Sequence, residues 1–277
     1  MQNPPMSSWR SADLQANGLR LHVTRTGGAK PPLILAHGFS DDGLCWASVA
    51  QVLAARYDMI MPDARGHGRS ETPEQGYDSL EQAADLAGII HGLELNQPIL
   101  LGHSMGAATA LALAGRYPGL PRAILLEDPP PFWTDQPDRS AEWEAQQRAW
   151  IARLQAQTRE QIIAAQHAAA PAWPEADLGP WADSKLRLNL NALHRDPRTA
   201  PDWPLLIRAI TCPVLLITAD TERGAIVSPA AATALQALLP QVRVARVAGA
   251  GHNIRREQYD EYMRSVGGFL DTLTAES

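Results

Sequence analysis

Two residues of this chain have the side chains and local context that nucleophilic catalysis requires, and the first is Ser104. It stands in Gly102-His103-Ser104-Met105-Gly106, a G-x-S-x-G motif between a short apolar run and an Ala/Leu-rich stretch of helical composition. The order strand, tight turn, helix predicts a strained turn that lifts the serine hydroxyl clear of a sheet. Glycine suits positions 102 and 106 because a Cβ at either would collide with the neighbouring strand or helix. The alternative interpretation of the motif is a glycine-bounded serine in an ordinary loop.

The second residue is His252. A serine hydroxyl needs a base within hydrogen-bond reach, and histidine is the usual one at neutral pH. Of the eight histidines, His252 alone follows the last predicted strand, in Ala248-Gly249-Ala250-Gly251-His252. Because the carboxyl ends of parallel strands meet at one edge of a sheet, we expect this loop to approach Ser104. The alternative is a histidine in a surface loop.

The elements that must position these residues alternate between short apolar strands and helices. We expect a hairpin over 12–26, a strand from Pro31 that ends in His37-Gly38, and strands over 58–62, 98–102, 122–128, 212–218 and 242–247. We expect helices over 44–56, 79–94, 107–117 and 257–274, and a further helix that opens at Ser228-Pro229. This pattern predicts the α/β class, with a mostly parallel eight-stranded sheet and helices on both faces. Residues 132–205 hold no convincing strand and predict helices near 140–156, 158–170 and 182–194. They are expected to form a helical cap on a core made of 1–131 and 206–277.

Composition limits the classes of partner. The 277 residues carry a net charge of −6, which argues against nucleic acid or an anionic membrane as partner. The first residues lack the basic start and apolar stretch of a signal peptide, and no apolar run approaches the roughly 18 residues of a membrane helix. We therefore expect a cytoplasmic protein, with Cys45 and Cys212 as free buried thiols.

The chain resembles the α/β-hydrolase family over nearly its whole length. The resemblance is carried by His37-Gly38-Phe39, the glycine-rich turn 63–70, the motif at 102–106 and Gly249-x-Gly251-His252. It implies Ser104 as nucleophile, His252 as base, and an oxyanion hole made by the backbone N–H groups of Phe39 and Met105. The turn at 63–70 is structural in this family.

Four carboxylates are candidates for the acid that would complete a catalytic triad with Ser104 and His252. The stretch after the seventh strand departs from the family's commonest pattern, which leaves Asp220 and Glu222 as imperfect candidates. Asp128, at the end of the sixth strand, resembles the acid of some family branches and is our first choice. Glu127 is a further candidate. Strand alternation points Glu127 and Asp128 to opposite faces, so only one of them can reach His252.

The expected reaction is acyl transfer to water. A serine at the turn argues against epoxide hydrolysis and dehalogenation, which in this family use aspartate there. Six of the eight tryptophans lie in the predicted cap. They suggest an apolar, aromatic pocket, for which we select Trp133, Trp181 and Trp203. The interpretation is a hydrolase of a medium-sized hydrophobic ester or lactone, a small-molecule substrate.

Other functions use the same residues. A carbon–carbon bond hydrolase or a cofactor-free perhydrolase would carry the same triad, and a ligand receptor could share the fold. No metal or organic cofactor is expected, because no His/Cys cluster has ligand spacing and the turn at 63–70 does not open a dinucleotide-binding unit.

Overall fold

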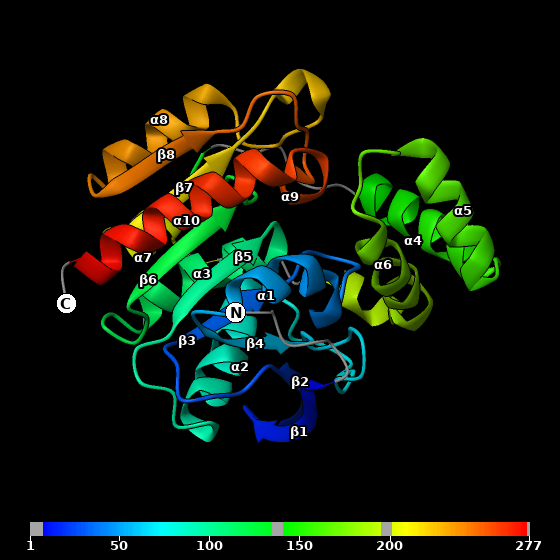
Figure 1. The fold of residues 1–277 in the computed structure, drawn as a ribbon, viewed down its shortest axis with the longest axis horizontal. Helices are drawn as coiled ribbons and strands as arrows, with labels where there is room; N and C mark the ends of the chain where they lie inside the picture. The colour runs from blue at the N-terminus through cyan, green and yellow to red at the C-terminus, as the bar shows by residue number, and fades with distance from the viewer. Residues whose placement is uncertain (1–7, 135–140, 195–200, 276–277) are drawn as a thin grey trace.

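A single sheet forms the centre of the computed structural model, which describes residues 8–134, 141–194 and 201–275 (Figure 1). Its strands are β1 (Arg10–Ala16), β2 (Leu19–Arg25), β3 (Pro32–Ala36), β4 (Asp58–Pro62), β5 (Ile99–His103), β6 (Ala123–Glu127), β7 (Val214–Thr218) and β8 (Val242–Arg246). Their order is β1-β2-β4-β3-β5-β6-β7-β8. The β1–β2 and β2–β4 pairs are antiparallel and the other pairs are parallel. The predicted α/β class and mostly parallel eight-stranded sheet are confirmed.

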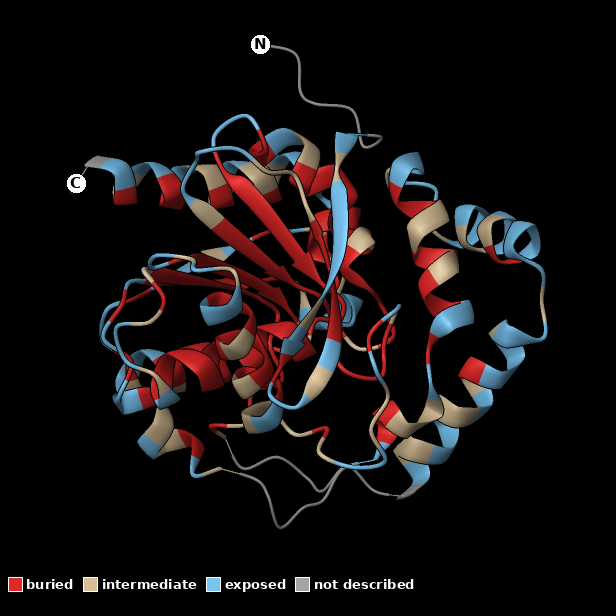
Figure 2. Ribbon diagram, turned by 90° about the horizontal axis from the view of Figure 1, so that it is seen from below, coloured by how far each residue is buried: buried red, intermediate tan, exposed pale blue. Residues whose placement is uncertain are grey.

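Helices cover both faces of the sheet, and the inner strands are therefore buried on both sides (Figure 2). Ile34, Leu100 and Leu126 face one side, and Leu33, Leu101 and Leu125 face the other. The first face packs against α2 (Ser79–Gly92), α3 (Met105–Arg116), α7 (Trp203–Arg208) and α8 (Pro229–Leu238). The second packs against α1 (Ala47–Leu53), α9 (Ile254–Glu257) and α10 (Tyr259–Ala275). This alternation places consecutive residues of one strand in two separate cores.

Residues 141–194, which lie between β6 and β7 in the sequence, form a helical lobe beside the carboxyl ends of the strands (Figure 1). It contains α4 (Ala141–Gln155), α5 (Arg159–Ala169), α6 (Glu175–Arg187) and the short 3-10 helix η3 (Leu190–Leu193). The helix predicted over 182–194 is wrong in its bounds, because Pro180 lies inside α6 instead of separating two helices. Division of the chain into a cap at 132–205 and a core stays a prediction.

Two smaller predictions concern the cysteines and the membrane. Cys45 and Cys212 are both free and buried, as expected. In the ranges that the structure covers, no helix combines the length and apolar character needed to cross a bilayer.

Candidate active site

Ser104 lies in the tight turn between β5 and α3. Its backbone has φ 49° and ψ −113°, a conformation that a residue with a side chain rarely adopts. A Cβ on Gly106 would lie 2.2 Å from the Ala36 carbonyl oxygen, and a Cβ on Gly102 would lie 2.4 Å from the Gly106 carbonyl oxygen. The collisions predicted for the two glycines are confirmed. The turn is strained and closely packed, and it presents Ser104 to a cavity.

His252 lies in the loop between β8 and α9, and Asp128 orients its ring. The Nδ1–H of His252 donates to Asp128 Oδ2 at 2.6 Å. The Asp128 side chain is fully buried and also accepts hydrogen bonds from two backbone groups, Ile226 N and Val227 N, each at 2.9 Å. A carboxylate held in this way fixes the histidine tautomer that leaves Nε2 free to accept a proton.

The other three candidate carboxylates do not reach His252. Glu127 points to the opposite face of the sheet, where its Oε2 lies 3.1 Å from Arg255 Nη1. Asp220 shapes the loop that carries His252, because its Oδ2 accepts from Gly249 N at 2.8 Å. Glu222 is exposed, and its Oε2 accepts from the adjacent Thr221 hydroxyl at 3.3 Å. Of the four candidates, the structure brings Asp128 to the imidazole.

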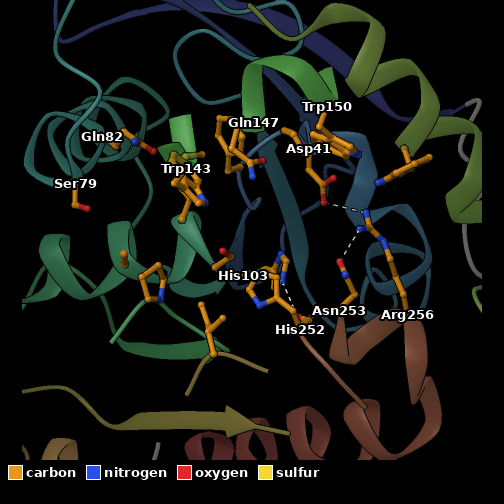
Figure 3. A pocket seen from close by; sticks show the side chains of 18 of the residues that line it. Asp41, Ser79, Gln82, His103, Trp143, Gln147, Trp150, His252, Asn253 and Arg256 are labelled. Carbon is orange, nitrogen blue, oxygen red and sulfur yellow. Dashed lines mark hydrogen bonds and ion pairs between the residues drawn. The ribbon is translucent and has the colours of Figure 1, made fainter. Parts of the chain in front are cut away.

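His103 supports the backbone of His252, a contact that sequence reasoning did not identify. Its Nε2–H donates to the His252 carbonyl oxygen at 3.0 Å, and the two ring centroids are 4.7 Å apart (Figure 3). Burial lowers the pKa of His103 well below its usual value, with nearby positive charge adding to the effect. The ring is therefore a neutral, permanent donor to this loop.

The expected oxyanion hole lies at the same cavity. Phe39 follows β3, and Met105 is the first residue of α3. Both line the cavity with Ser104 and His252. Within the described ranges, neither backbone N–H has a hydrogen-bond partner. An unpaired N–H at the start of a helix is suited to a developing negative charge.

The cavity has a volume of about 420 Å³, and one of the three selected tryptophans lines it. Trp181 lines it, together with Trp143, Trp150 and Trp173. Trp133 and Trp203 do not line it, which corrects that expectation. The indole N–H of Trp133 donates to the Ala231 carbonyl oxygen at 2.8 Å, and Trp203 stacks on Phe132 with centroids 5.2 Å apart. Both lie where the inserted segment leaves and rejoins the core, so they pack against the helices of the sheet.

The cavity wall is more polar than a pattern of tryptophans suggests. On α4, Trp143, Gln147 and Trp150 share one helix face, so an amide stands between two aromatic rings (Figure 3). Further polar lining residues are Ser40, Asp41, Ser79, Gln82, Gln166, Asn253 and Arg256. The expectation of an apolar pocket is therefore corrected to one of mixed character.

A buried ionic cluster stands at one side of the cavity, and sequence reasoning did not find it. The Asp41 carboxylate contacts Lys185 Nζ at 2.7 Å, Arg256 Nη2 at 2.9 Å and Arg255 Nη2 at 3.2 Å. Burial would raise the pKa of Asp41, but the three positive charges outweigh it and hold the pKa well below its usual value. Arg256 Nη1 also donates to Asn253 Oδ1 at 3.2 Å (Figure 3).

The described residues also bear on metal binding. Across residues 8–134, 141–194 and 201–275, no group of three or more His, Cys, Asp or Glu side chains could hold a metal ion. The groups that line the cavity include a serine and an imidazole oriented by a carboxylate.

Comparison with known proteins finds relatives that are hydrolases. Residues 31–255 match the family model of the alpha/beta hydrolase fold. N-formylmaleamate deformylase of Pseudomonas putida is 31% identical over 271 residues, covering 94% of this chain and 96% of that protein. A 2-(acetamidomethylene)succinate hydrolase of Mesorhizobium japonicum is 29% identical, covering 89% and 90%. The crystal structure of an E-2-(acetamidomethylene)succinate hydrolase superimposes with a TM-score of 0.78 at 26% identity, covering 95% of this chain and 99% of that one.

The strained serine turn and the strand order of the sheet lead to the same family as these matches, which cover most of the sequence. The chain belongs to the α/β-hydrolase fold family, and it is a hydrolase.

Proposed function

We propose that this chain is a serine hydrolase that cleaves a carboxylic acyl bond through an acyl-enzyme on Ser104. The observation that carries the proposal is the 2.6 Å hydrogen bond from His252 Nδ1 to the buried Asp128, at the cavity that Ser104 also lines. An imidazole held in this way is prepared to take a proton at Nε2.

The steps follow from the groups at the cavity. Ser104 Oγ attacks the carbonyl carbon and passes its proton to His252 Nε2. The negative oxygen that forms accepts hydrogen bonds from the N–H groups of Phe39 and Met105. The imidazolium then protonates the leaving group, which departs and leaves the acyl group on Ser104. Water, deprotonated by His252, hydrolyses this acyl-enzyme, so that the acid and the free serine are released.

The substrate is proposed to be a medium-sized ester or lactone. A cavity of about 420 Å³ is at the small end of the usual range for ligand pockets. Its four tryptophans suit an apolar part of the substrate, and the amides among them suit a polar substituent. This modifies the expectation of a wholly hydrophobic substrate.

A second candidate is hydrolysis of an N-acyl bond. The names of the two curated relatives describe a deformylase and a hydrolase of an acetamido compound, and each covers at least 89% of this chain. Amide hydrolysis uses the same acyl-enzyme, with His252 protonating a leaving nitrogen. The side-chain amide of Gln147, which lines the cavity, suits an amide group of such a substrate.

The test is a panel of matched substrates. Pairs of an ester and an amide that share one acyl group, in formyl, acetyl and butyryl series, are assayed with the wild type and with Ser104→Ala. Lactones of increasing ring size are assayed beside them. Ser79→Ala is the control, because Ser79 also lines the cavity but lies on α2. Turnover that Ser104→Ala abolishes and Ser79→Ala retains supports the proposal, and the faster member of each pair decides between ester and amide. Turnover that survives in Ser104→Ala, or binding of these compounds without any turnover, contradicts it.

A further inference from the structure

Lys185, on the helical lobe, contacts the loop that carries one of the proposed oxyanion donors. It lies near the end of α6 and is only 1% exposed. Its Nζ donates to the Ser40 carbonyl oxygen at 2.8 Å and to Asp41 Oδ1 at 2.7 Å. These two acceptors directly follow Phe39, so α6 holds the backbone next to the proposed oxyanion N–H.

The ammonium group has few other positions available to it. A third bond, to Ser184 Oγ at 3.1 Å, gives a partner to each of its three donors. The Trp181 ring centroid lies 4.9 Å from Nζ. Burying a charge without partners is expensive, so this lysine is stable at this depth only while α6 sits against the loop.

The loop itself needs external support. Ser40 has φ 69°, a left-handed conformation that costs free energy for a residue other than glycine. Its carbonyl oxygen is held by Lys185, and the next side chain, Asp41, is also held by Arg255 and Arg256. The strained residue is therefore supported by the turn's own hydrogen bond, from the Asp41 N–H to the Gly38 carbonyl oxygen at 3.1 Å, and by side chains from α6 and from the segment after His252.

We propose that Lys185 is a positioning residue that sets the direction of the Phe39 N–H in the oxyanion hole. The inference rests on the proposed function. Loss of the ammonium leaves the Ser40 carbonyl oxygen without its donor and lets the peptide planes beside Phe39 rotate. The Asp41 carboxylate retains Arg255 and Arg256, so the fold keeps its main ion pairs.

The test variant is Lys185→Met, which keeps an unbranched side chain as far as Cε and removes the ammonium group. Removal of a whole oxyanion donor lowers kcat by about 10² to 10³, and a misdirected donor is expected to lower kcat by about tenfold to a hundredfold. KM is expected to stay within about twofold. Affinity for a trifluoromethyl ketone, which forms an oxyanion on the serine, is expected to fall by the same factor as kcat/KM.

The matched control is Arg159→Met. Arg159, at the start of α5, forms an exposed ion pair at 2.7 Å with Asp183, which lies on α6 as Lys185 does. It is expected to keep wild-type kcat and ketone affinity. Titration with a fluorophosphonate counts the competent sites in each sample, so a partly unfolded variant is not mistaken for a slow one. Lys185→Gln, whose amide keeps two uncharged N–H donors, is measured in the same way if Lys185→Met does not fold.

The outcomes separate this inference from the function on which it rests. A loss confined to kcat and ketone affinity in the Lys185 variants supports the positioning role. Ser104-dependent turnover with unchanged kcat in those variants, or an equal loss in Arg159→Met, overturns that role alone. Wild-type turnover that persists in Ser104→Ala overturns the proposed function instead.

Discussion

Asp128 and Glu127 are neighbours at the end of β6 whose carboxylates have different partners. Asp128 receives the His252 ring and two backbone N–H groups, and Glu127 receives Arg255 on the other face. In the proposed reaction His252 becomes positively charged, and the ionised Asp128 stabilises that charge.

The first prediction follows from this contact. Asp128→Asn is expected to lower kcat by about 10⁴, because an amide neither stabilises the imidazolium nor selects the required tautomer. Steady-state kinetics with Ser104→Ala as blank measure the effect.

Glu222→Gln is the control, since Glu222 is exposed and its carboxylate accepts a hydrogen bond from the adjacent Thr221 hydroxyl. It is expected to keep wild-type kcat. The reverse pattern, with a slow Glu222→Gln and a nearly normal Asp128→Asn, would show that another acid serves His252.

The second prediction concerns stability against pH. Burial, followed by the nearby His37, lowers the pKa of His67 from 6.5 to about 3. The unfolded chain therefore binds one more proton than the folded chain between these values, and stability present above pH 6.5 is lost as the pH falls. The free energy of unfolding should fall by about 1.4 kcal/mol per pH unit from this residue alone.

His67→Asn keeps a donor for the Arg65 carbonyl oxygen, which His67 Nδ1 contacts at 2.9 Å. Urea unfolding at several pH values between 7 and 5 gives the free energy of unfolding as a function of pH. In this variant the slope of that free energy against pH is expected to be smaller by the equivalent of about one proton. The matched control is His91→Asn, because His91 is exposed on α2. A slope equal to that of the wild type in His67→Asn would contradict the assignment.

The sequence predicts those site residues whose neighbours in the chain form a recognisable pattern. The glycines beside Ser104 and the glycine-rich loop before His252 mark places where the backbone must turn sharply, and strand alternation separates Glu127 from Asp128. His103 stands inside the motif but gave no signal of its own. Its role as a donor appears only when the loop of His252 folds onto it.

At the scale of elements, the turn between β5 and α3 depends on how closely α3 approaches β3. The would-be Cβ of Gly106 meets main-chain atoms of Ala36 and His37, at 2.2 and 2.7 Å from their carbonyl oxygens. Backbone atoms of a strand paired on both sides cannot move away as a flexible side chain can. The spacing of helix and strand thus requires glycine at 106.

The third prediction tests this packing. Gly106→Ala is expected to lower the free energy of unfolding by about 1–3 kcal/mol, the usual cost of overpacking, and to displace the start of α3. Urea unfolding measures the change. Gly92→Ala, at the end of α2, is the control and is expected to be neutral or slightly stabilising, because in the described residues no atom beyond the local backbone lies within 4 Å of the added carbon. Equal stability of the two variants would contradict the argument.

Element bounds in the inserted segment were harder to predict than those in the sheet. Apolar strands buried on both faces have a strong pattern, whereas α5 buries only Ile162 and is exposed over most of its length, so its apolar pattern is weak. Pro180 was taken to separate helices and lies within one. Trp133 and Trp203 were assigned to the pocket from composition, but tryptophan also anchors chain crossings to a core.

At the scale of the whole molecule, three distant parts of the chain meet at Asp41. Lys185 is 144 positions away along the sequence, Arg255 is 214 away and Arg256 is 215 away. No local pattern marks such a cluster, because each member is an ordinary charged residue until the fold buries it. The cluster connects the helical lobe, the loop after β3 and the segment after His252, which are the parts that surround Ser104.

The central claim is that Ser104 forms a covalent acyl intermediate beside an imidazole oriented by Asp128. The most direct measurement is peptide mapping by mass spectrometry after a rapid acid quench of the protein with an activated ester. The account predicts the acyl group on the peptide that contains Ser104, in the wild type and in Ser79→Ala, and its absence in Ser104→Ala. An acyl group on another residue, or turnover of the ester without any adduct and without dependence on Ser104, would contradict it.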